Sequence, residues 1–391
     1  MNKSNGKKEY NSYKLKIKLI ITCIILIILG STLFIKSEVE IFVNSLLGYE
    51  GALVFDSSAD LKVHFIDVGQ GDSIAIELPD GKNMLIDAGT TSSTVDLKNY
   101  LDKNIFDSEQ EKVFDYVILT HSDADHSGGM AMIYNNYQVN YSYRPYEYSD
   151  ASVEPNTNIF NSLVHNTLVY KSYVSAVYDE PNSIVEYSSA GETISGYSTN
   201  NNNLQYKLTF ITPNETYYSS ANDYSSIILL EYNDRKILLT GDASEEGMSE
   251  LYNARTIYDL SNIDIYKASH HGSASNDCNK LEVLQVLQPT FVVISVGENN
   301  SYGHPSSVFL ENLSLVNVNE NNIYRTDFNG TIVFSIMYNS NEIGVKTDVS
   351  NKPLYLSWLI IVSIIFIIIN LIIYADYIKN LKKYVKKYKI K

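Results

Sequence analysis

The sequence predicts an α/β (α+β) fold in which two β-sheets pack face to face and helices cover the outside. Two observations indicate this fold. Short apolar runs bounded by turn residues recur in two similar halves of the chain, and each half begins with an antiparallel group of strands. Helical patterns follow these groups. With 391 residues and a hydrophobic fraction of 45%, the chain can bury the core of such a sandwich.

The first half supplies three successive strands, a helix and a fourth strand. A turn at Pro79–Gly81 separates the second strand from the third, and Ser92 or Ser93 can cap the helix. The expected ranges are 61–68, 72–78 and 83–88 for the first three strands, 92 to about 104 for the helix and 114–120 for the fourth strand.

The second half repeats this plan. We expect strands at 204–212, 226–232, 236–241, 263–268 and 289–296, and helices at 244–254, 277–288 and 307–316. Asn329 and Gly330 are expected to close a final hairpin. Residues 134–203 are dense in Tyr, Asn and Ser and show weak periodicity, so we expect loose connections and one or two helices there.

Two uncharged apolar segments flank this region, and both are long enough to be predicted as transmembrane helices. A cleaved signal peptide is the alternative for the first of them, although no small-x-small cleavage site follows it. The predicted organisation is a basic tail at 1–18, a transmembrane helix at 19–36, a linker at 37–60, the sandwich domain at 61–340, a second transmembrane helix at 354–374 and a basic tail at 375–391.

The charge distribution predicts the orientation in the membrane. The formal net charge of the whole chain is −15. Because the two tails carry +5 and +6, the rest of the chain must carry −26. Lysine-rich flanks stay in the cytoplasm, which places both termini inside and the domain outside the cell membrane. Such acidity argues against tight, non-specific binding to nucleic acid. With only Cys23 and Cys278, no internal disulfide framework is expected.

Histidine and aspartate gather at the ends of three predicted strands. The first group, HSDADH, comprises His121, Asp123, Asp125 and His126; Asp242 follows a second strand, and His270 and His271 follow a third. His304 follows a fourth strand, whereas His64 and His165 fall outside the pattern and are interpreted as structural. Imidazole and carboxylate together suit Zn²⁺, Mn²⁺ or Fe²⁺. The alternative is a set of polar loops and helix caps.

These stretches resemble the metal motifs of the metallo-β-lactamase superfamily, in the branch found as the C-terminal domain of the ComEC competence protein. HSDADH, GDAS and HHGS occur in order with DVGQGDS, NDYSSIILL and SYGHPS. The resemblance covers about Lys62 to Phe334. It implies an αββα metallo-β-lactamase sandwich that holds one or two divalent metal ions, Zn or Mn.

The resemblance also implies roles for individual residues. His121 and Asp123 resemble ligands of a first metal; Asp125, His126 and His271 resemble ligands of a second, and Asp242 resembles the bridging ligand. Asp125 and His270 are the candidate catalytic residues for proton transfer. Asp87 resembles an acid that orients a loop ligand, and we expect Gln70, Asp72 and His304 to line the site. Each of these last four could equally be a turn or packing residue.

The implied function is that of a membrane-anchored, extracytoplasmic phosphodiesterase or nuclease in which a metal-bound hydroxide attacks a phosphodiester. The expected partners are a phosphodiester substrate, with single-stranded DNA as the family's example, and the lipid bilayer. The alternatives are hydrolysis of another ester class, such as a phosphocholine ester, a lactone or a β-lactam, and a non-catalytic binding protein on the same fold.

The chain departs in two respects from the family that it resembles. His165 is the only histidine between His126 and Asp242, and it does not fit the extra first-metal ligand of many superfamily hydrolases. A full ComEC protein also carries a polytopic channel and an oligonucleotide-binding module. We therefore expect that this chain does not form that channel alone, and a link to DNA uptake does not follow from the fold.

Overall fold

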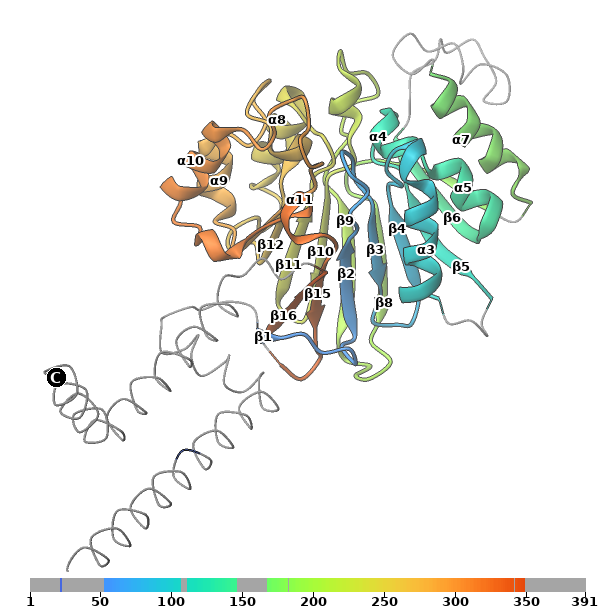
Figure 1. The fold of residues 1–391 in the computed structure, drawn as a ribbon, viewed down its shortest axis with the longest axis horizontal. Coiled ribbons are helices and arrows are strands. Elements are labelled where there is room, and N and C mark those ends of the chain that lie inside the picture. Colours follow the sequence, from blue (N-terminus) through green and yellow to red (C-terminus); the bar gives the residue numbers. More distant parts are fainter. Residues whose placement is uncertain are drawn as a thin grey trace, which may run out of the picture. The chain divides into compact units, whose positions relative to one another are not determined.

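Two β-sheets packed face to face form the centre of the structure, and helices cover both outer faces (Figure 1). The structure is a computed structural model that describes residue 22 and residues 53–106, 111–145, 167–181, 183–340 and 342–348. Gly51–Ser350 form one compact unit. The predicted mixed α/β sandwich is therefore confirmed.

The first sheet has nine strands among the described residues. It runs from an edge formed by β1 to an edge formed by β7, and it mixes antiparallel and parallel neighbours. The spatial order is β1 (Leu53–Val54), β16 (Ile343–Thr347), β15 (Ile332–Ile336), β2 (Leu61–Phe65), β3 (Ile74–Glu77), β4 (Asn83–Ile86), β5 (Val113–Ile118), β6 (Gln138–Pro145) and β7 (Ile184–Ser188).

The second sheet has seven strands in the described part of the chain. Its parallel portion, β11 to β14, lies beside an antiparallel portion, β8 to β10. The spatial order is β14 (Ile323–Arg325), β13 (Phe291–Ile294), β12 (Ile265–Lys267), β11 (Arg235–Leu239), β10 (Ile228–Tyr232), β9 (Gln205–Phe210) and β8 (Thr193–Tyr197).

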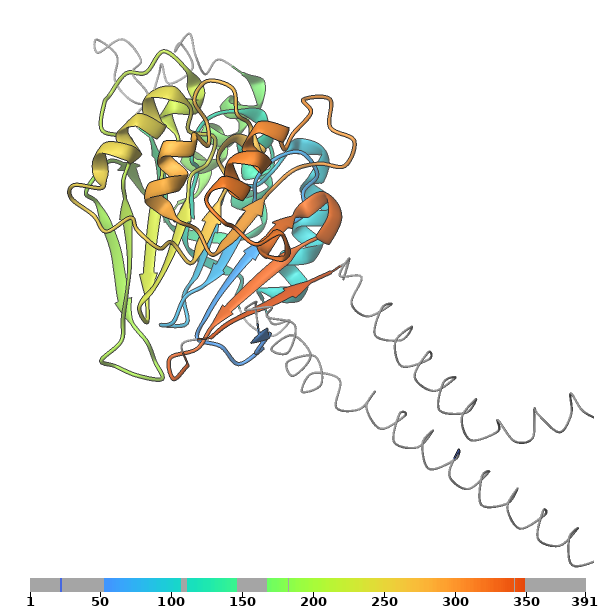
Figure 2. The ribbon, with the colours of Figure 1, turned by 90° about the vertical axis from the view of Figure 1, so that its left-hand side faces the viewer.

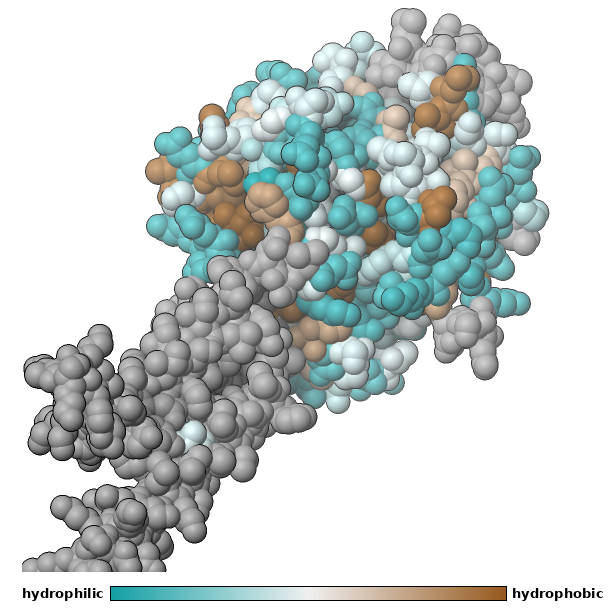
Figure 3. All heavy atoms as spheres, in the orientation of Figure 1, coloured by the Kyte–Doolittle hydropathy of each residue, from teal (hydrophilic) through white to brown (hydrophobic). Residues whose placement is uncertain are grey.

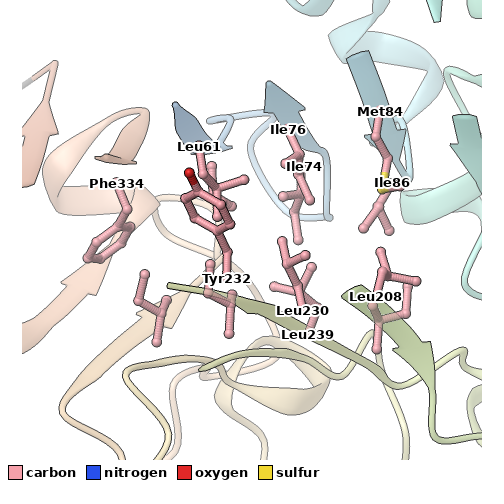
Figure 4. Packing of buried hydrophobic residues seen from close by; sticks show 14 of the residues in the cluster. Leu61, Ile74, Ile76, Met84, Ile86, Leu208, Leu230, Tyr232, Leu239 and Phe334 are labelled. Carbon is pink, nitrogen blue, oxygen red and sulfur yellow. The ribbon is translucent and has the colours of Figure 1, made fainter. Parts of the chain in front are cut away.

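Three buried apolar layers hold the sandwich together. The central layer joins the two sheets, and Figure 4 shows Ile74 and Ile76 of one sheet facing Leu230 and Leu239 of the other. A second layer lies between the first sheet and the helices α3 (Thr94–Asn104), α5 (Met130–Asn136) and α7 (Leu168–Asp179). The third lies beneath α8 (Glu245–Ala254), α9 (Leu281–Leu287) and α10 (Ser307–Leu315), which stand in front of the sheets in Figure 2.

Two local expectations are wrong. Residues 134–203 contain three strands, β6, β7 and β8, in addition to the expected helix α7. Asn329 and Gly330 do not close a hairpin: they end the short helix α11 (Thr326–Asn329), and β14 and β15 lie in different sheets. The chain crosses between the sheets at Gly330, where φ is +62°, a conformation that glycine adopts easily. The final hairpin is instead formed by β15 and β16.

The predicted transmembrane segments, 19–36 and 354–374, lie outside the described residues apart from Thr22. Within the part of the chain that the structure describes, no helix combines the length and the apolar composition needed to cross a bilayer. Strands β1 and β16 extend the sandwich on either side of the range 61–340.

Candidate metal centre

The candidate centre lies where neighbouring parallel strands of both sheets end. β4 and β5 run parallel in the first sheet, and β11, β12 and β13 run parallel in the second. The loops that leave these strands carry Asp87, His121, Asp242, His271 and His304. The carboxyl ends of parallel strands are the usual place for a binding site in such folds. The structure therefore brings these side chains to one end of the sandwich, beside the short helix α4 (Ala124–Ser127) (Figure 1).

Four side chains form a compact group with metal-ligating atoms. His271 Nε2 lies 3.1 Å from Asp125 Oδ2 and 3.2 Å from Asp242 Oδ2, and His126 Nε2 lies 3.2 Å from Asp242 Oδ1. The ligand atoms of all four residues lie within 4.8 Å of one another. His126, Asp242 and His271 are buried, and Asp125 is partly exposed. These are the residues that resemble the second-metal set together with the bridging aspartate.

The polar atoms of this group fit a divalent cation. His126 Nε2 and Asp242 Oδ1 are buried and face each other, yet neither makes a hydrogen bond among the described residues. Buried polar atoms are nearly always satisfied, so a pair left without a hydrogen bond indicates a missing partner. Two imidazole nitrogens and two carboxylates are a donor set that binds Zn²⁺ or Mn²⁺.

The two histidines of the group are held by their other ring nitrogens. His126 Nδ1 lies 2.7 Å from Asp87 Oδ2, and His271 Nδ1 lies 2.9 Å from the Ser295 carbonyl oxygen. An acceptor at Nδ1 fixes the tautomer in which Nε2 is free to bind a metal. Asp87 also accepts hydrogen bonds from the Thr120 N–H, at 2.8 Å, and from the Thr120 hydroxyl, at 2.7 Å. It therefore links the end of β4 to the loop after β5.

Backbone close to the centre leaves no room for side chains at two glycines. A Cβ atom on Gly71 would lie 2.3 Å from the Asp125 carbonyl oxygen, and one on Gly129 would lie 2.2 Å from the Ala88 carbonyl oxygen. The Asp72 N–H donates to the same Asp125 carbonyl, at 3.1 Å. The glycines thus allow the loops after β2 and β4 to press against the HSDADH segment.

His270 and His271 both have a left-handed backbone, with φ of +47° and +53°. This conformation costs free energy in residues other than glycine, and it persists only where the surroundings enforce it. Buried Asn279 does so: its Nδ2 donates to the carbonyls of Ser269, at 2.8 Å, and Ser273, at 2.7 Å. These two hydrogen bonds hold the backbone turn that directs both imidazoles toward Asp242. Sequence reasoning did not identify Asn279, which follows the HHGS motif at no recognisable spacing.

The group creates a strongly negative local field. Burial alone would lower the pKa of His271, but the Asp242 and Asp125 carboxylates outweigh burial and raise this pKa to about 10. Burial would also lower the pKa of His126, but the Asp242 and Asp87 carboxylates outweigh burial and raise this pKa well above its usual value. Burial would raise the pKa of Asp242, but the two histidines have the larger effect and lower this pKa well below its usual value. A site that favours positive charge this strongly favours a cation.

His121 and Asp123 are not among the four residues of this group, although the His121 ring lies 4.2 Å from the His126 ring and its buried Nε2 also lacks a hydrogen bond among the described residues. His121 Nε2 lies 3.7 Å from Asp123 Oδ2, and among the described residues no third side chain completes a metal-ligating group with the pair. His121 is fully buried, with Nδ1 3.1 Å from the Thr120 hydroxyl and 3.4 Å from the Ser225 hydroxyl. The structure thus assembles one of the two expected ligand sets, and a serine lies beside the other.

Lys267 is a part of the site that sequence reasoning missed. This lysine ends β12, is fully buried, and forms an ion pair with buried Asp72. Its Nζ donates to the Gly241 carbonyl, at 3.0 Å, and lies 3.8 Å from Asp242 Oδ1. The sequence signal was a charged residue at the end of an apolar strand, directly before the two histidines. Asp72 is outside the four-residue group, but it adjoins the group at 3.9 Å from His126 Nδ1 and 3.7 Å from His271 Nδ1, and it forms a second cluster of possible ligands with Asp87 and His126.

The remaining predicted residues surround the group. His270 is partly exposed, with Nε2 3.9 Å from Asp242 Oδ2, and its ring lies 5.8 Å from the ring of His304. Burial lowers the pKa of both His270 and His304, so both are neutral at pH 7. Gln70 lies further out, where its side-chain oxygen accepts a hydrogen bond from the Gly297 N–H at 3.1 Å. This hydrogen bond joins two loops, and Gln70 is not among the four residues of the metal group.

Comparison with known proteins relates this chain to one superfamily. Residues 66–154 match the model of the metallo-beta-lactamase superfamily. The chain is 28% identical to "ComE operon protein 3" of Bacillus subtilis over 293 residues, which are 71% of this chain and 33% of that protein. It is 26% identical to "Recombination protein 2" of Haemophilus influenzae over 257 residues, 64% of this chain and 26% of that protein. The chain thus spans about one third or less of the relatives it matches.

Among solved structures, the metallo-beta-lactamase fold protein YhfI from Bacillus subtilis superposes with a TM-score of 0.41 at 11% identity. The superposition covers 68% of this chain and 95% of that one.

Proposed function

Because residues 66–154 match the metallo-β-lactamase superfamily and the chain is similar to competence proteins of the ComEC type, we propose that this chain is a metal-dependent phosphodiesterase. The observation that carries the proposal is the group formed by Asp125, His126, Asp242 and His271. A purely structural loop has no use for four converging side chains of which two, His126 and Asp242, present buried ligand atoms without a hydrogen bond among the described residues. For this reason the proposal favours an enzyme over a binding protein.

Asp125, His126, Asp242 and His271 would hold the ion. A divalent ion in this position supplies a positive charge for the phosphoryl oxygens and a water molecule of lowered pKa. Zn²⁺ and Mn²⁺ both suit the donor set, and the share of carboxylates favours the harder Mn²⁺.

Proton transfer is assigned to two residues at the open side of the group. His271 and His126 keep the pKa of Asp125 low against the opposing effect of burial, so its partly exposed carboxylate stays ionised and can orient an attacking water by accepting a hydrogen bond from it. His270 is neutral, and its Nδ1 lies 3.4 Å from the Asn222 amide nitrogen, which is its donor. This contact leaves the proton on His270 Nε2, which faces Asp242 and can donate a hydrogen bond to a phosphoryl or leaving-group oxygen.

The cellular setting belongs to the same proposal. The two apolar segments at 19–36 and 354–374, each next to a lysine-rich tail, support a chain anchored in the cell membrane with its domain on the extracytoplasmic side. The substrate is a phosphodiester, with single-stranded DNA as the first candidate from the resemblance to ComEC. The acidity of the domain makes a phosphocholine ester the alternative to test beside it.

The test is hydrolysis of bis(p-nitrophenyl) phosphate by the full chain with Mn²⁺ or Zn²⁺, against the variant Asp242→Asn. We expect hydrolysis that chelator abolishes, and a loss of at least 100-fold in the variant. A nitrophenyl carboxylic ester, a lactone and a β-lactam are assayed in parallel. Hydrolysis of one of these compounds, and not of the diester, would show that the substrate of the site belongs to another ester class. Metal binding without any hydrolysis would favour a binding protein.

A further inference from the structure

A ladder of three aromatic rings leads from the metal group to the surface. The His270 ring lies nearest to Asp242 and meets the His304 ring edge-on, at 5.8 Å between centroids. The Tyr302 ring stacks on His304 with the two planes only 9° apart, at 5.9 Å. Tyr302 is the outermost rung, and 71% of its surface is exposed to solvent.

The loop that carries Tyr302 is fixed in place by its own hydrogen bonds. His304 N–H donates to the Asn300 side-chain oxygen, at 3.0 Å, and Asn300 Nδ2 donates back to the His304 carbonyl, at 2.8 Å. The same Nδ2 donates to the Gly297 carbonyl, at 3.1 Å. The exposed ring is therefore presented by an ordered loop, which reduces the entropic cost of binding a ligand against it.

The parallel stack selects the shape of that ligand. His304 occupies one face of Tyr302, so a planar ring on the other face would extend the stack. Aromatic rings prefer such offset stacking at centroid distances of about 4.5–7 Å. A quaternary ammonium group, in contrast, is recognised by several ring faces that surround it as a cage. The arrangement of Tyr302 and His304 favours a flat ring.

Because the domain is acidic, affinity for a nucleic acid would depend more on stacking than on contacts to the phosphates. Polar residues dominate the face shown in Figure 3, and acidic groups outnumber basic ones outside the two tails. Lys267, the lysine nearest to the site, is fully buried in its pair with Asp72. Lysine and arginine contacts to the phosphate backbone are thus a weak source of affinity here. Stacking on a nucleobase is uncharged and tolerates every base.

We propose that Tyr302 is a nucleobase-stacking subsite, which holds a base adjacent to the phosphodiester that lies at the metal group. This inference rests on the proposed function and names its substrate class as single-stranded nucleic acid. It predicts that recognition depends on the bases of the strand, with little preference among them, and not only on the phosphates.

The experiment compares two substrates that share a backbone. One is an oligothymidylate, and the other is the same oligonucleotide with an abasic tetrahydrofuran unit at every position. The full chain and the variants Tyr302→Ala and Tyr302→Phe are assayed for kcat and KM on both. Tyr197→Ala is the matched control, because Tyr197 is also exposed but lies on edge strand β8, at the opposite end of the second sheet from the metal group.

We expect Tyr302→Ala to raise KM for oligothymidylate by about 5- to 150-fold, the value of stacking one base on one ring. KM for the abasic strand, and both constants of the Tyr302→Phe and Tyr197→Ala variants, should stay within about twofold of wild type. Equal effects of Tyr302→Ala on both strands, or no effect on either, would overturn the proposal. The same variants are assayed on p-nitrophenyl phosphorylcholine, and a loss confined to this substrate would also overturn the proposal and assign the ring to a cation.

Failure of the proposed function is recognised separately. If the wild-type chain does not hydrolyse bis(p-nitrophenyl) phosphate, the phosphodiesterase assignment fails. Binding of the two fluorescent strands, followed by anisotropy, then decides the stacking proposal alone. Tighter binding of oligothymidylate that Tyr302→Ala removes would support it, and equal binding of the two strands would contradict it.

Discussion

His126 Nδ1 lies 2.7 Å from Asp87 Oδ2, in the buried space between the ends of β4 and β5. This contact fixes which nitrogen of His126 faces Asp242. It also joins two loops, because Asp87 accepts two further hydrogen bonds from Thr120. We therefore predict that metal affinity at this site depends on Asp87, a carboxylate that is not in the four-residue group.

Asp87→Asn keeps the shape of the side chain and removes its charge. We expect metal affinity to fall by about 10- to 100-fold, the usual effect of losing such a partner of a histidine ligand. Competition with a fluorescent chelator measures the affinity, and circular dichroism checks the fold. Asp115→Asn is the control, because Asp115 also links β4 to β5, through the Asn83 N–H, but near the opposite ends of these strands. Equal losses in both variants would refute the specific role of Asp87.

Lys267→Met leaves Asp72 with an uncompensated buried charge. Removing one partner of a buried ion pair costs about 3–5 kcal/mol of unfolding free energy. We expect a loss of this size in urea unfolding of the chelated protein. Adding Asp72→Asn should restore more than half of it, because the second change removes the orphaned charge. Additive losses in the double variant would contradict the pairing.

Asp102 should give acid-dependent stability to the first half of the sandwich. Burial raises its pKa, but hydrogen bonds from Lys112, Lys98 and Tyr137 dominate and lower it to about 2. A carboxylate with a depressed pKa stabilises the fold above its unfolded pKa and loses that effect as pH falls through the folded pKa. After allowance for solvent screening, the contribution is about 1 kcal/mol.

Asp102→Asn should therefore lower the unfolding free energy by about 1 kcal/mol at pH 7 and by roughly half as much at pH 3. Urea unfolding at several pH values measures this difference. A difference that stays constant between pH 7 and pH 3 would show that the lost contacts, and not ionisation, cause the effect.

Metal removal should destabilise the domain. An ion present at about 100 times its dissociation constant contributes about 2.7 kcal/mol. For a domain of this size that corresponds to roughly 5–10 °C in Tm. We expect a chelator to lower Tm by this amount, readdition of Mn²⁺ or Zn²⁺ to restore it, and Asp242→Asn to abolish the response. A similar metal response in Asp242→Asn would place the ion elsewhere.

Much of the site could be predicted because its residues follow apolar strands directly. Thr120, Leu239 and Lys267 each end or follow such a run, and parallel neighbours bring the next side chains together. The pattern could not show which histidine nitrogen faces inward, or that the four-residue group leaves out His121, whose ring lies 4.2 Å from the ring of His126. Those facts depend on Asp87, Ser225 and Ser295, which come from distant parts of the chain.

The errors have physical causes too. Strand β6 alternates poorly between buried and exposed positions and is rich in tyrosine, so its period was not recognisable. Asn329–Gly330 has the composition of a hairpin turn, but β14 completes a parallel edge with β13 while β15 pairs with β2. Tertiary pairing decided the topology there. Lysine is rarely buried without a partner of opposite charge. The sequence alone did not show that Asp72 lies beside Lys267, so it gave no reason to expect this lysine in the interior.

The proposed function requires that hydrolysis occurs at the group of Asp125, His126, Asp242 and His271. The most direct test measures bound metal and the initial rate of bis(p-nitrophenyl) phosphate hydrolysis in the same samples as metal is titrated into the chelated full chain. We predict that the rate rises in proportion to the metal bound by wild type and stays at background in Asp242→Asn. A rate that persists without bound metal, or in Asp242→Asn, would contradict the account.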